Sequence, residues 1–306
     1  MPLTAHDRPP VYAPMVWRSY AKVNLYLDVV CKRRDGYHNI ETIFQTVNLF
    51  DEMTFLDDKH LSMTCSGADL DGGTSNLVYR AASLLQEQTG CTRGARIHLE
   101  KKIPIAAGLA GGSGNAAATL AALNKLWDLR LPLPRLERYA RMLGADVPYC
   151  LHGGAMAGTL RGENMHPLTP LKSVWFILVH PPAAVSAAHV YNHPLLGMNT
   201  ERPFAGRTPS FRKALLGLQE SDYARVVFNR MERPVFAEHQ TLAEIKNALL
   251  EAGCVAAAMS GSGPTLFGVC SSMRDALRIG ESLKGKNFDC RTHIAAPVPN
   301  GIEWVR

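Results

Sequence analysis

The stretch GLAGGSGNAA, residues 108–117, places four glycines within seven positions, and the run NAAATLAALNKLW that follows favours a helix. Glycine has no side chain, so a ligand can come close to the backbone N–H groups of such a loop. The N-terminus of a helix adds partial positive charge at the same point. We therefore expect an anion site, with phosphate as its usual ligand. The alternative is a glycine-rich turn that binds nothing.

Two known types of glycine loop agree poorly with this stretch. A P-loop ends in Gly-Lys-Ser/Thr, and no lysine follows here. Residues 112–117 match the dinucleotide pattern G-x-G-x-x-A, but a long loop precedes them. No βαβ unit with an acidic residue at the end of its second strand follows. Because residues 112–117 match part of the pattern, a dinucleotide-dependent dehydrogenase remains an alternative.

Composition bounds the class of protein. The chain has 306 residues, which favours two domains, and 46% hydrophobic residues, which fits a globular core. It has no apolar run long enough for a membrane span. Residues 1–20 lack the apolar core of a signal peptide, and we expect a loose tail there. The net charge of +6 suits an anionic substrate, but no basic run with aromatics points to nucleic acid.

The seven cysteines follow no disulfide or zinc spacing. An odd and scattered set is typical of reduced thiols, so we expect a cytoplasmic protein.

The N-terminal half reads as strands followed by helices. The sequence YAKVNLYLDVV, residues 20–30, alternates and predicts a half-buried strand with Lys22 and Asn24 on its polar face. Asp35-Gly36 predicts a hairpin turn into a second strand. A helix is expected over 74–90, capped by Thr74 or Ser75. Further helices are expected from the glycine loop to about residue 128 and over 133–144.

The C-terminal half predicts a second layered unit. Strand 174–180 is followed by an irregular connection over 192–215 and a helix over 240–253. Strand, turn and strand then occupy 254–270, before a helix at 271–285 and a last strand at 288–296. This order is typical of a ferredoxin-like α+β sandwich.

Three stretches in order resemble the motifs of the GHMP kinases. They are AKVNLYLDVVCKRRDGYHNIETIFQTVNLFDEM (21–53), PIAAGLAGGSGNAA (104–117) and AAMSGSGPTLFGVC (257–270). The resemblance implies an α+β, two-domain GHMP kinase architecture. Its N-terminal domain, over 1–160, would be ribosomal-protein-S5-domain-2-like and carry the phosphate loop and catalytic residues, and its C-terminal domain, over 161–306, would be ferredoxin-like. It also implies a small-molecule kinase that uses ATP and Mg²⁺.

Two short segments narrow the acceptor. DGYH (35–38) together with GADVP (144–148) is specific within that family, and DGYH separates the sequence from homoserine and mevalonate kinases. They imply that the substrate is a cytidine diphosphate-linked polyol, phosphorylated on a hydroxyl group. We expect a monomer or weak homodimer without nucleic-acid or membrane partners. Another GHMP kinase, such as homoserine kinase, and a non-catalytic nucleotide-binding protein remain alternatives.

The resemblance assigns the nucleotide to one continuous stretch, and Ser113 also to magnesium. The stretch comprises Pro104, Ile105, Ala106, Ala107, Gly108, Leu109, Ala110, Gly111, Gly112, Ser113 and Gly114. Ala110 stands where these kinases usually have glycine, and Gly114 where they have serine. We expect altered nucleotide affinity at most.

Lys22 and Asp146 are the expected catalytic residues. Lys22 would hold the transferring phosphate or polarise the acceptor hydroxyl; outside the family it would read as a solvated strand lysine. Asp146 alone reads as a helix N-cap, and the resemblance implies that it is the general base. We predict that the two side chains lie close together.

Four residues are expected to bind the acceptor: Asn24, Tyr37, His38 and Tyr191. Asn24 lies roughly 6–7 Å along the strand from Lys22. The resemblance assigns Tyr37 and His38 to cytidine, with Tyr191 as an opposite stacking face. The turn of Ser260, Gly261, Ser262 and Gly263 is expected to support the site. His152 and His180 read as structural.

Overall fold

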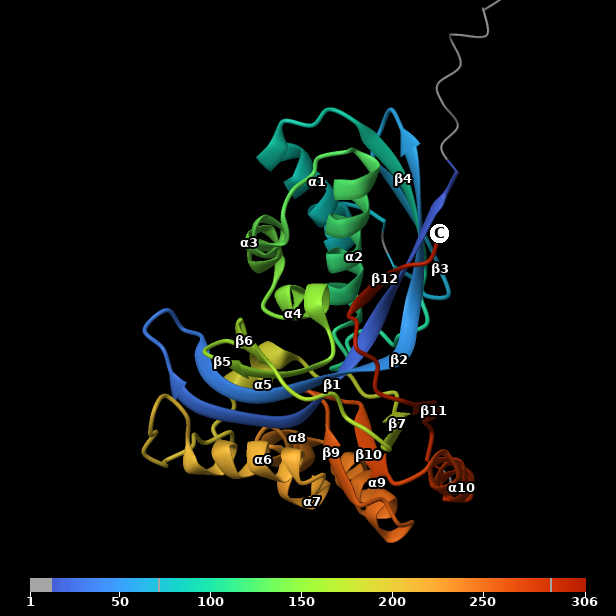
Figure 1. Cartoon of the computed structure of the whole chain (residues 1–306). Helices are drawn as coiled ribbons and strands as arrows, with labels where there is room; N and C mark the ends of the chain where they lie inside the picture. The colour runs from blue at the N-terminus through green and yellow to red at the C-terminus, as the bar shows by residue number, and fades with distance from the viewer. Residues whose placement is uncertain (1–12, 71, 287) are drawn as a thin grey trace, which may run out of the picture.

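The computed structural model describes residues 13–70, 72–286 and 288–306. Two sheets, each with helices packed on it, form two units that share the long, curved pair β1 and β2 (Figure 1). Of the expected N-terminal tail, residues 1–12 lie outside the described residues. The expectation of a tail is wrong from Met15 onward, because β1 begins there.

Among the described residues the first sheet has eight strands, in the order β12-β1-β2-β4-β3 with β5, β6 and β8 attached at its side. Their bounds are β1 (Met15–Lys32), β2 (His38–Asp58), β3 (Ser62–Ser66), β4 (Gly94–Glu100), β5 (Ala155–Thr159), β6 (Asn164–Pro167), β8 (Phe228–Asn229) and β12 (Ile302–Trp304). The predicted hairpin is confirmed, since β1 pairs antiparallel with β2 on either side of residues 33–37.

The expectation that β1 is half-buried is wrong. Residues 21–29 are all buried, on both faces of the strand. The polar face, which carries Lys22 and Asn24, contacts the glycine loop and the turn at Ser260 rather than solvent. Buried polar side chains need such partners, so this face is the first sign of a site.

Four helices cover one face of the first sheet (Figure 1). They are α1 (Leu77–Thr89), α2 (Gly111–Leu126), α3 (Leu133–Leu143) and α4 (Val147–His152). The cap of α1 is Asn76, whose side chain accepts from the Val78 N–H at 3.0 Å, and not Thr74 or Ser75. The αL residue Gly90 ends α1 as predicted. Helix α2 packs its alanines in the core and begins directly at the glycine loop.

The second sheet confirms the ferredoxin-like layout. Its antiparallel order among the described residues is β11-β7-β10-β9, with chain order β7, β9, β10, β11. The strands are β7 (Trp175–His180), β9 (Ala256–Met259), β10 (Leu266–Cys270) and β11 (Arg291–Ala295). The helices of this half are α5 (Ala187–Asn192), α6 (Pro209–Gln219), α7 (Tyr223–Val226), α8 (Glu232–Glu238), α9 (Gln240–Glu251) and α10 (Met273–Lys284).

The expected irregular connection over 192–215 is partly wrong, because α6 begins inside it at Pro209. Thr208 caps this helix, accepting from the Phe211 N–H at 3.3 Å, and proline occupies the first helical position. Thr208-Pro209 is therefore the signal for a helix start within this proline-rich segment.

The chain crosses more than once between the two units. β6, which follows residue 160, still pairs with β5 of the first sheet. After β7 the chain returns to the first sheet at β8 and again at β12, and both of these strands pair with β1. A boundary near residue 160 stays a proposal.

All seven cysteines are free. Within the described residues, no helix is both long enough and apolar enough to cross a membrane.

Candidate active site

The glycine loop and the starts of two helices enclose a first cavity, of about 430 Å³, which we term the loop cavity. It is lined by Leu70, Ser75, Asn76, Leu77, Leu99, Lys101, Pro104, Ile105, Ala106, Ala107, Gly108, Ala110, Gly111, Gly112, Ser113 and Asn115. Both α1 and α2 begin at its wall, and the first N–H groups of a helix have no partner within it. The cavity is therefore suited to an anion.

Two residues of the predicted nucleotide stretch lie outside this lining. Leu109 is buried in the core, and its carbonyl accepts the backbone N–H of Lys22 at 3.1 Å. Gly114 packs under β1, where an added Cβ would lie 3.4 Å from the Cβ of Ser19. The absence of a serine hydroxyl at 114 thus leaves Ser113 as the loop hydroxyl that faces the cavity.

The turn at Ser260 holds the glycine loop in place. The Ser260 hydroxyl donates to the Gly108 carbonyl at 2.9 Å, and the Thr265 N–H donates to the Ala107 carbonyl at 3.3 Å. Gly108 has φ 75°, and a Cβ there would lie 2.1 Å from the Ser260 carbonyl oxygen. Glycine is required at this position both by its conformation and by the contact.

A second cavity, of about 300 Å³, lies on the other side of the loop, and we term it the acceptor cavity. Its lining is Lys22, Asn24, Leu27, Ile40, Phe44, Gly108, Ala110, Ser113, Ala145, Asp146, Arg161, Ala187, Tyr191, Met231, Gly261 and Ser262. The two cavities share Gly108, Ala110 and Ser113. A group bound in one cavity can therefore meet a group bound in the other at the loop.

Lys22 and Asp146 lie together in the acceptor cavity, which confirms the predicted proximity. Lys22 Nζ is 3.7 Å from Asp146 Oδ2 and donates to Asn24 Oδ1 at 2.7 Å and to the Gly108 carbonyl at 3.0 Å. The Lys22 side chain is 5% exposed, so this buried ammonium depends on these oxygens. Asp146 occupies the N-cap position of α4, but its side chain caps nothing. The capping interpretation is wrong in that respect, and the carboxylate faces the cavity.

The residues expected to bind cytidine are only partly together. The His38 ring stacks on the Tyr191 ring, with centroids 5.1 Å apart and planes 17° apart. Burial lowers the pKa of the His38 imidazole and raises the pKa of the Tyr191 hydroxyl, so both rings favour the neutral form. Tyr37 lies apart from the cavity lining and is 58% exposed at the hairpin.

Arg161 is a cavity residue that the sequence reading missed. Its guanidinium lies over the Tyr37 ring, 4.6 Å from the centroid, and it lines the acceptor cavity. Its Nε is buried and makes no hydrogen bond among the described residues, and its ion-pair partner Glu163 Oε1 lies 3.8 Å away. A buried donor that makes no hydrogen bond is costly unless a ligand accepts one from it. Nothing in TLRGEN marks this arginine, which long-range packing brings to the site.

A buried ion pair beneath the loop cavity was also missed. Lys101 Nζ donates to Asp51 Oδ2 at 2.7 Å, and Asn115 Nδ2 donates to the same carboxylate oxygen at 2.9 Å. The other oxygen, Oδ1, accepts the backbone N–H groups of Lys102 and Ile103. Burial lowers the pKa of the Lys101 ammonium, which Asp51 partly offsets. This network fixes the end of β4 where the glycine loop begins.

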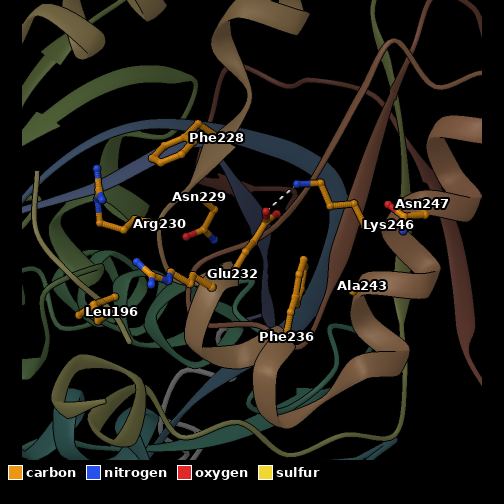
Figure 2. A pocket seen from close by; sticks show the side chains of 10 residues that line it. Leu196, Phe228, Asn229, Arg230, Glu232, Phe236, Ala243, Lys246 and Asn247 are labelled. Carbon is orange, nitrogen blue, oxygen red and sulfur yellow. Dashed lines mark hydrogen bonds and ion pairs between the residues drawn. The ribbon is translucent and has the colours of Figure 1, made fainter. Parts of the chain in front are cut away.

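A third cavity lies behind the turn at Ser260. It measures about 470 Å³ and is lined by Leu196, Phe228, Asn229, Arg230, Glu232, Arg233, Phe236, Ala243, Lys246 and Asn247. Figure 2 shows Glu232 and Lys246 of α8 and α9 pointing toward each other across it. Glu232 also accepts the Met259 N–H at 2.8 Å, and Asn229 donates to the carbonyls of Met259 and Gly261 at 2.7 Å each. The wall of this cavity therefore holds the turn that supports the glycine loop.

The sequence matches two family models, one for each half of the chain. The model described as GHMP kinases N terminal domain matches residues 76–154, and the model described as GHMP kinases C terminal matches residues 202–289. A protein from Synechococcus sp. (strain JA-3-3Ab) named 4-diphosphocytidyl-2-C-methyl-D-erythritol kinase is 39% identical over 269 residues. The alignment covers 86% of this chain and 87% of the relative.

Solved structures agree with these matches. A crystal structure of 4-(cytidine 5'-diphospho)-2C-methyl-D-erythritol kinase aligns with a TM-score of 0.75 at 33% identity, covering 92% of this chain and 99% of that one. A homoserine kinase from Cytophaga hutchinsonii aligns with a TM-score of 0.74, covering 97% of this chain and 99% of that one. Its identity is 18%, so this second likeness concerns the fold alone.

Proposed function

The chain belongs to the GHMP kinase family, among its 4-diphosphocytidyl-2-C-methyl-D-erythritol kinases, and we propose that it transfers the γ-phosphoryl group of ATP to the 2-hydroxyl of that substrate. The reaction belongs to the non-mevalonate route to isoprenoid precursors. The observation that best supports the proposal is the meeting of the loop and acceptor cavities at Gly108, Ala110 and Ser113. Phosphoryl transfer needs a donor and an acceptor aligned at one point.

In the proposed reaction, Asp146 takes the proton of the acceptor hydroxyl. The hydroxyl oxygen forms a bond to the γ-phosphorus as the bond between that phosphorus and the bridging oxygen breaks. The electron pair of the broken bond leaves with ADP. Asp146 is suited to this role because its carboxylate makes no capping bond and faces the cavity beside Lys22.

The remaining groups would neutralise negative charge. Lys22 lies between the glycine loop and Asp146, where the transferring phosphoryl group would pass, and the α2 N-terminus would bind the triphosphate. A hydroxyl oxygen is a suitable ligand for Mg²⁺, so Ser113, at the junction of the cavities, would hold the ion. When bound, Mg²⁺ would supply positive charge to the phosphate oxygens.

We assign acceptor recognition to the far wall of the acceptor cavity. Arg161, whose buried Nε makes no hydrogen bond and lies 3.8 Å from its ion-pair partner Glu163 Oε1, would bind the diphosphate of the acceptor. Tyr191 lines the same cavity and would contact the cytosine ring, with His38 behind it and Tyr37 at the rim. Because Tyr37 is exposed at the hairpin, its contact would require movement of that loop.

Release of ADP from ATP and Mg²⁺ tests this function directly. We expect turnover with 4-diphosphocytidyl-2-C-methyl-D-erythritol and none with homoserine. Asp146→Asn is expected to lower kcat by about 10²–10⁴-fold. Asp128→Asn is the matched control, because Asp128 is an exposed left-handed residue paired with Arg130, and asparagine tolerates that conformation. Turnover of homoserine alone would refute the proposed acceptor. An unchanged rate in Asp146→Asn would refute the role of Asp146 as the general base.

A further inference from the structure

Two histidines and one glutamate converge on the surface, outside the linings of the loop and acceptor cavities. His189 and His193 are four residues apart on and just after α5, and Glu238 ends α8. His189 Nε2 lies 2.9 Å and His193 Nε2 lies 3.1 Å from the same Glu238 oxygen. The potential ligand atoms of all three side chains lie within 4.8 Å of one another.

This donor set has the chemistry of a zinc-class site. Imidazole nitrogens suit Zn²⁺ and its neighbours in the transition series, and His₂Glu sets leave a fourth position open for water. Spacing of i and i+4 places both rings on one side of a helix. We propose that His189, His193 and Glu238 bind one divalent transition-metal ion, of the Zn²⁺ class and not Mg²⁺, and thereby tie α5 to α8.

The surroundings permit this binding at small cost. The His193 side chain is 12% exposed and fixed, whereas those of His189 and Glu238 are 57% and 40% exposed and can adjust toward an ion. The Leu195 N–H donates to His193 Nδ1 at 3.1 Å, and this bond would be given up when Nε2 binds metal and Nδ1 holds the proton. The Leu195 N–H would then need water as its partner.

The link that a bound ion makes between α5 and α8 would affect the acceptor cavity. Helix α5 has six residues, too few to be stable alone, and it carries Tyr191, which lines that cavity. Helix α8 begins at Glu232, whose carboxylate accepts a hydrogen bond from the backbone N–H of Met259, just before the supporting turn. A bound ion would therefore fix Tyr191 relative to this turn. That consequence rests on the proposed function, whereas metal binding does not.

Equilibrium dialysis against Zn²⁺ in excess Mg²⁺ tests the site without any turnover. We expect one Zn²⁺ per wild-type chain, and loss of this stoichiometric binding in His189→Ala, His193→Ala and Glu238→Gln. His152→Ala is the matched control, because His152 Nε2 contacts Glu137 at 2.7 Å without a second histidine. It should retain the ion. No stoichiometric binding by the wild type, or full binding by the His189 and His193 variants, as free cysteines would give, overturns the proposal.

The effect on the acceptor cavity is measured separately. Addition of one equivalent of Zn²⁺ should change the KM for the cytidyl acceptor in the wild type and leave kcat and the KM for ATP unchanged. The His189→Ala variant should show no such response. If Zn²⁺ binds as expected but the acceptor KM is the same with and without it, the proposed link to Tyr191 is wrong. If the acceptor is not turned over, the proposed function fails while the dialysis result stands.

Discussion

At the scale of single residues, positions 108 and 110 have the same left-handed backbone in different surroundings. Gly108 has φ 75°, and an added Cβ would lie 2.1 Å from the Ser260 carbonyl oxygen. Ala110 has φ 55° and already carries its Cβ at the wall shared by both cavities. Alanine at 110, where these kinases usually have glycine, is therefore disfavoured only by its backbone conformation. At 108 an alanine side chain would also clash with the neighbouring backbone.

The substitutions Gly108→Ala and Ala110→Gly are therefore expected to differ in their effect on stability and on ATP binding. Gly108→Ala adds left-handed strain and a backbone clash, and it should lower stability by at least about 2 kcal/mol and raise the KM for ATP. Ala110→Gly removes about 1 kcal/mol of strain but frees the unfolded chain by a similar amount. Its melting temperature and KM for ATP should stay nearly unchanged. Thermal melts and ADP-release kinetics on both variants measure this contrast, and equal losses would contradict it.

At the scale of elements, the short strand β8 joins the active site to the third cavity. β8 runs parallel to β1, with Asn229 opposite Leu27. The Asn229 amide donates to the carbonyls of Met259 and Gly261, and its oxygen accepts the Met231 N–H at 2.9 Å. Each polar atom of this buried side chain therefore has a partner, and two of the partners are Gly261, in the turn that supports the glycine loop, and Met259, just before that turn.

The isosteric change Asn229→Asp should disrupt this turn. It replaces two donated hydrogen bonds with a carboxylate facing two carbonyl oxygens, at a cost of about 2–4 kcal/mol. We expect kcat/KM to fall by about tenfold or more together with the melting temperature. Asn247→Asp introduces the same chemistry on an exposed residue of the same cavity and should change neither quantity (Figure 2). A similar effect of both variants would argue against the role of β8.

Elements with strong local signals could be predicted from the sequence, and those that depend on distant contacts could not. The Asp35-Gly36 turn, Gly90 and the glycine loop before α2 carry their own backbone chemistry. Short helices such as α5 and α8 are stabilised mainly by packing, so their sequences carried little periodic signal. The Lys22–Asp146 proximity was predicted because the family motifs implied it. The partners of Asp51 and the position of Arg161 arise from contacts across the fold, which one sequence does not encode locally.

At the scale of the whole molecule, the end of the chain braces the helix that carries Asp146 at its start. The Tyr20 N–H donates to the Gly301 carbonyl at 2.9 Å, and the Gly301 N–H donates to the His152 carbonyl at 3.3 Å. Gly301 thus connects β1 to the end of α4 just before β12 completes the first sheet. A Cβ on Gly301 would lie 2.1 Å from the Cys150 carbonyl oxygen within α4, so the contact admits no side chain.

Gly301→Ala should therefore affect both stability and catalysis. Overpacking of this kind costs about 1–3 kcal/mol, which should lower the melting temperature by roughly 2–10 °C. Because the clash is relieved by movement of α4 or of the C-terminal segment, kcat should fall while the KM for ATP changes less. Gly285→Ala is the matched control, since a Cβ there makes only an ordinary 3.6 Å contact and the backbone has φ −72°. Calorimetry and ADP-release kinetics on both variants decide the point: a Gly301→Ala protein that melts and turns over like Gly285→Ala would mean that the C-terminal segment does not position α4.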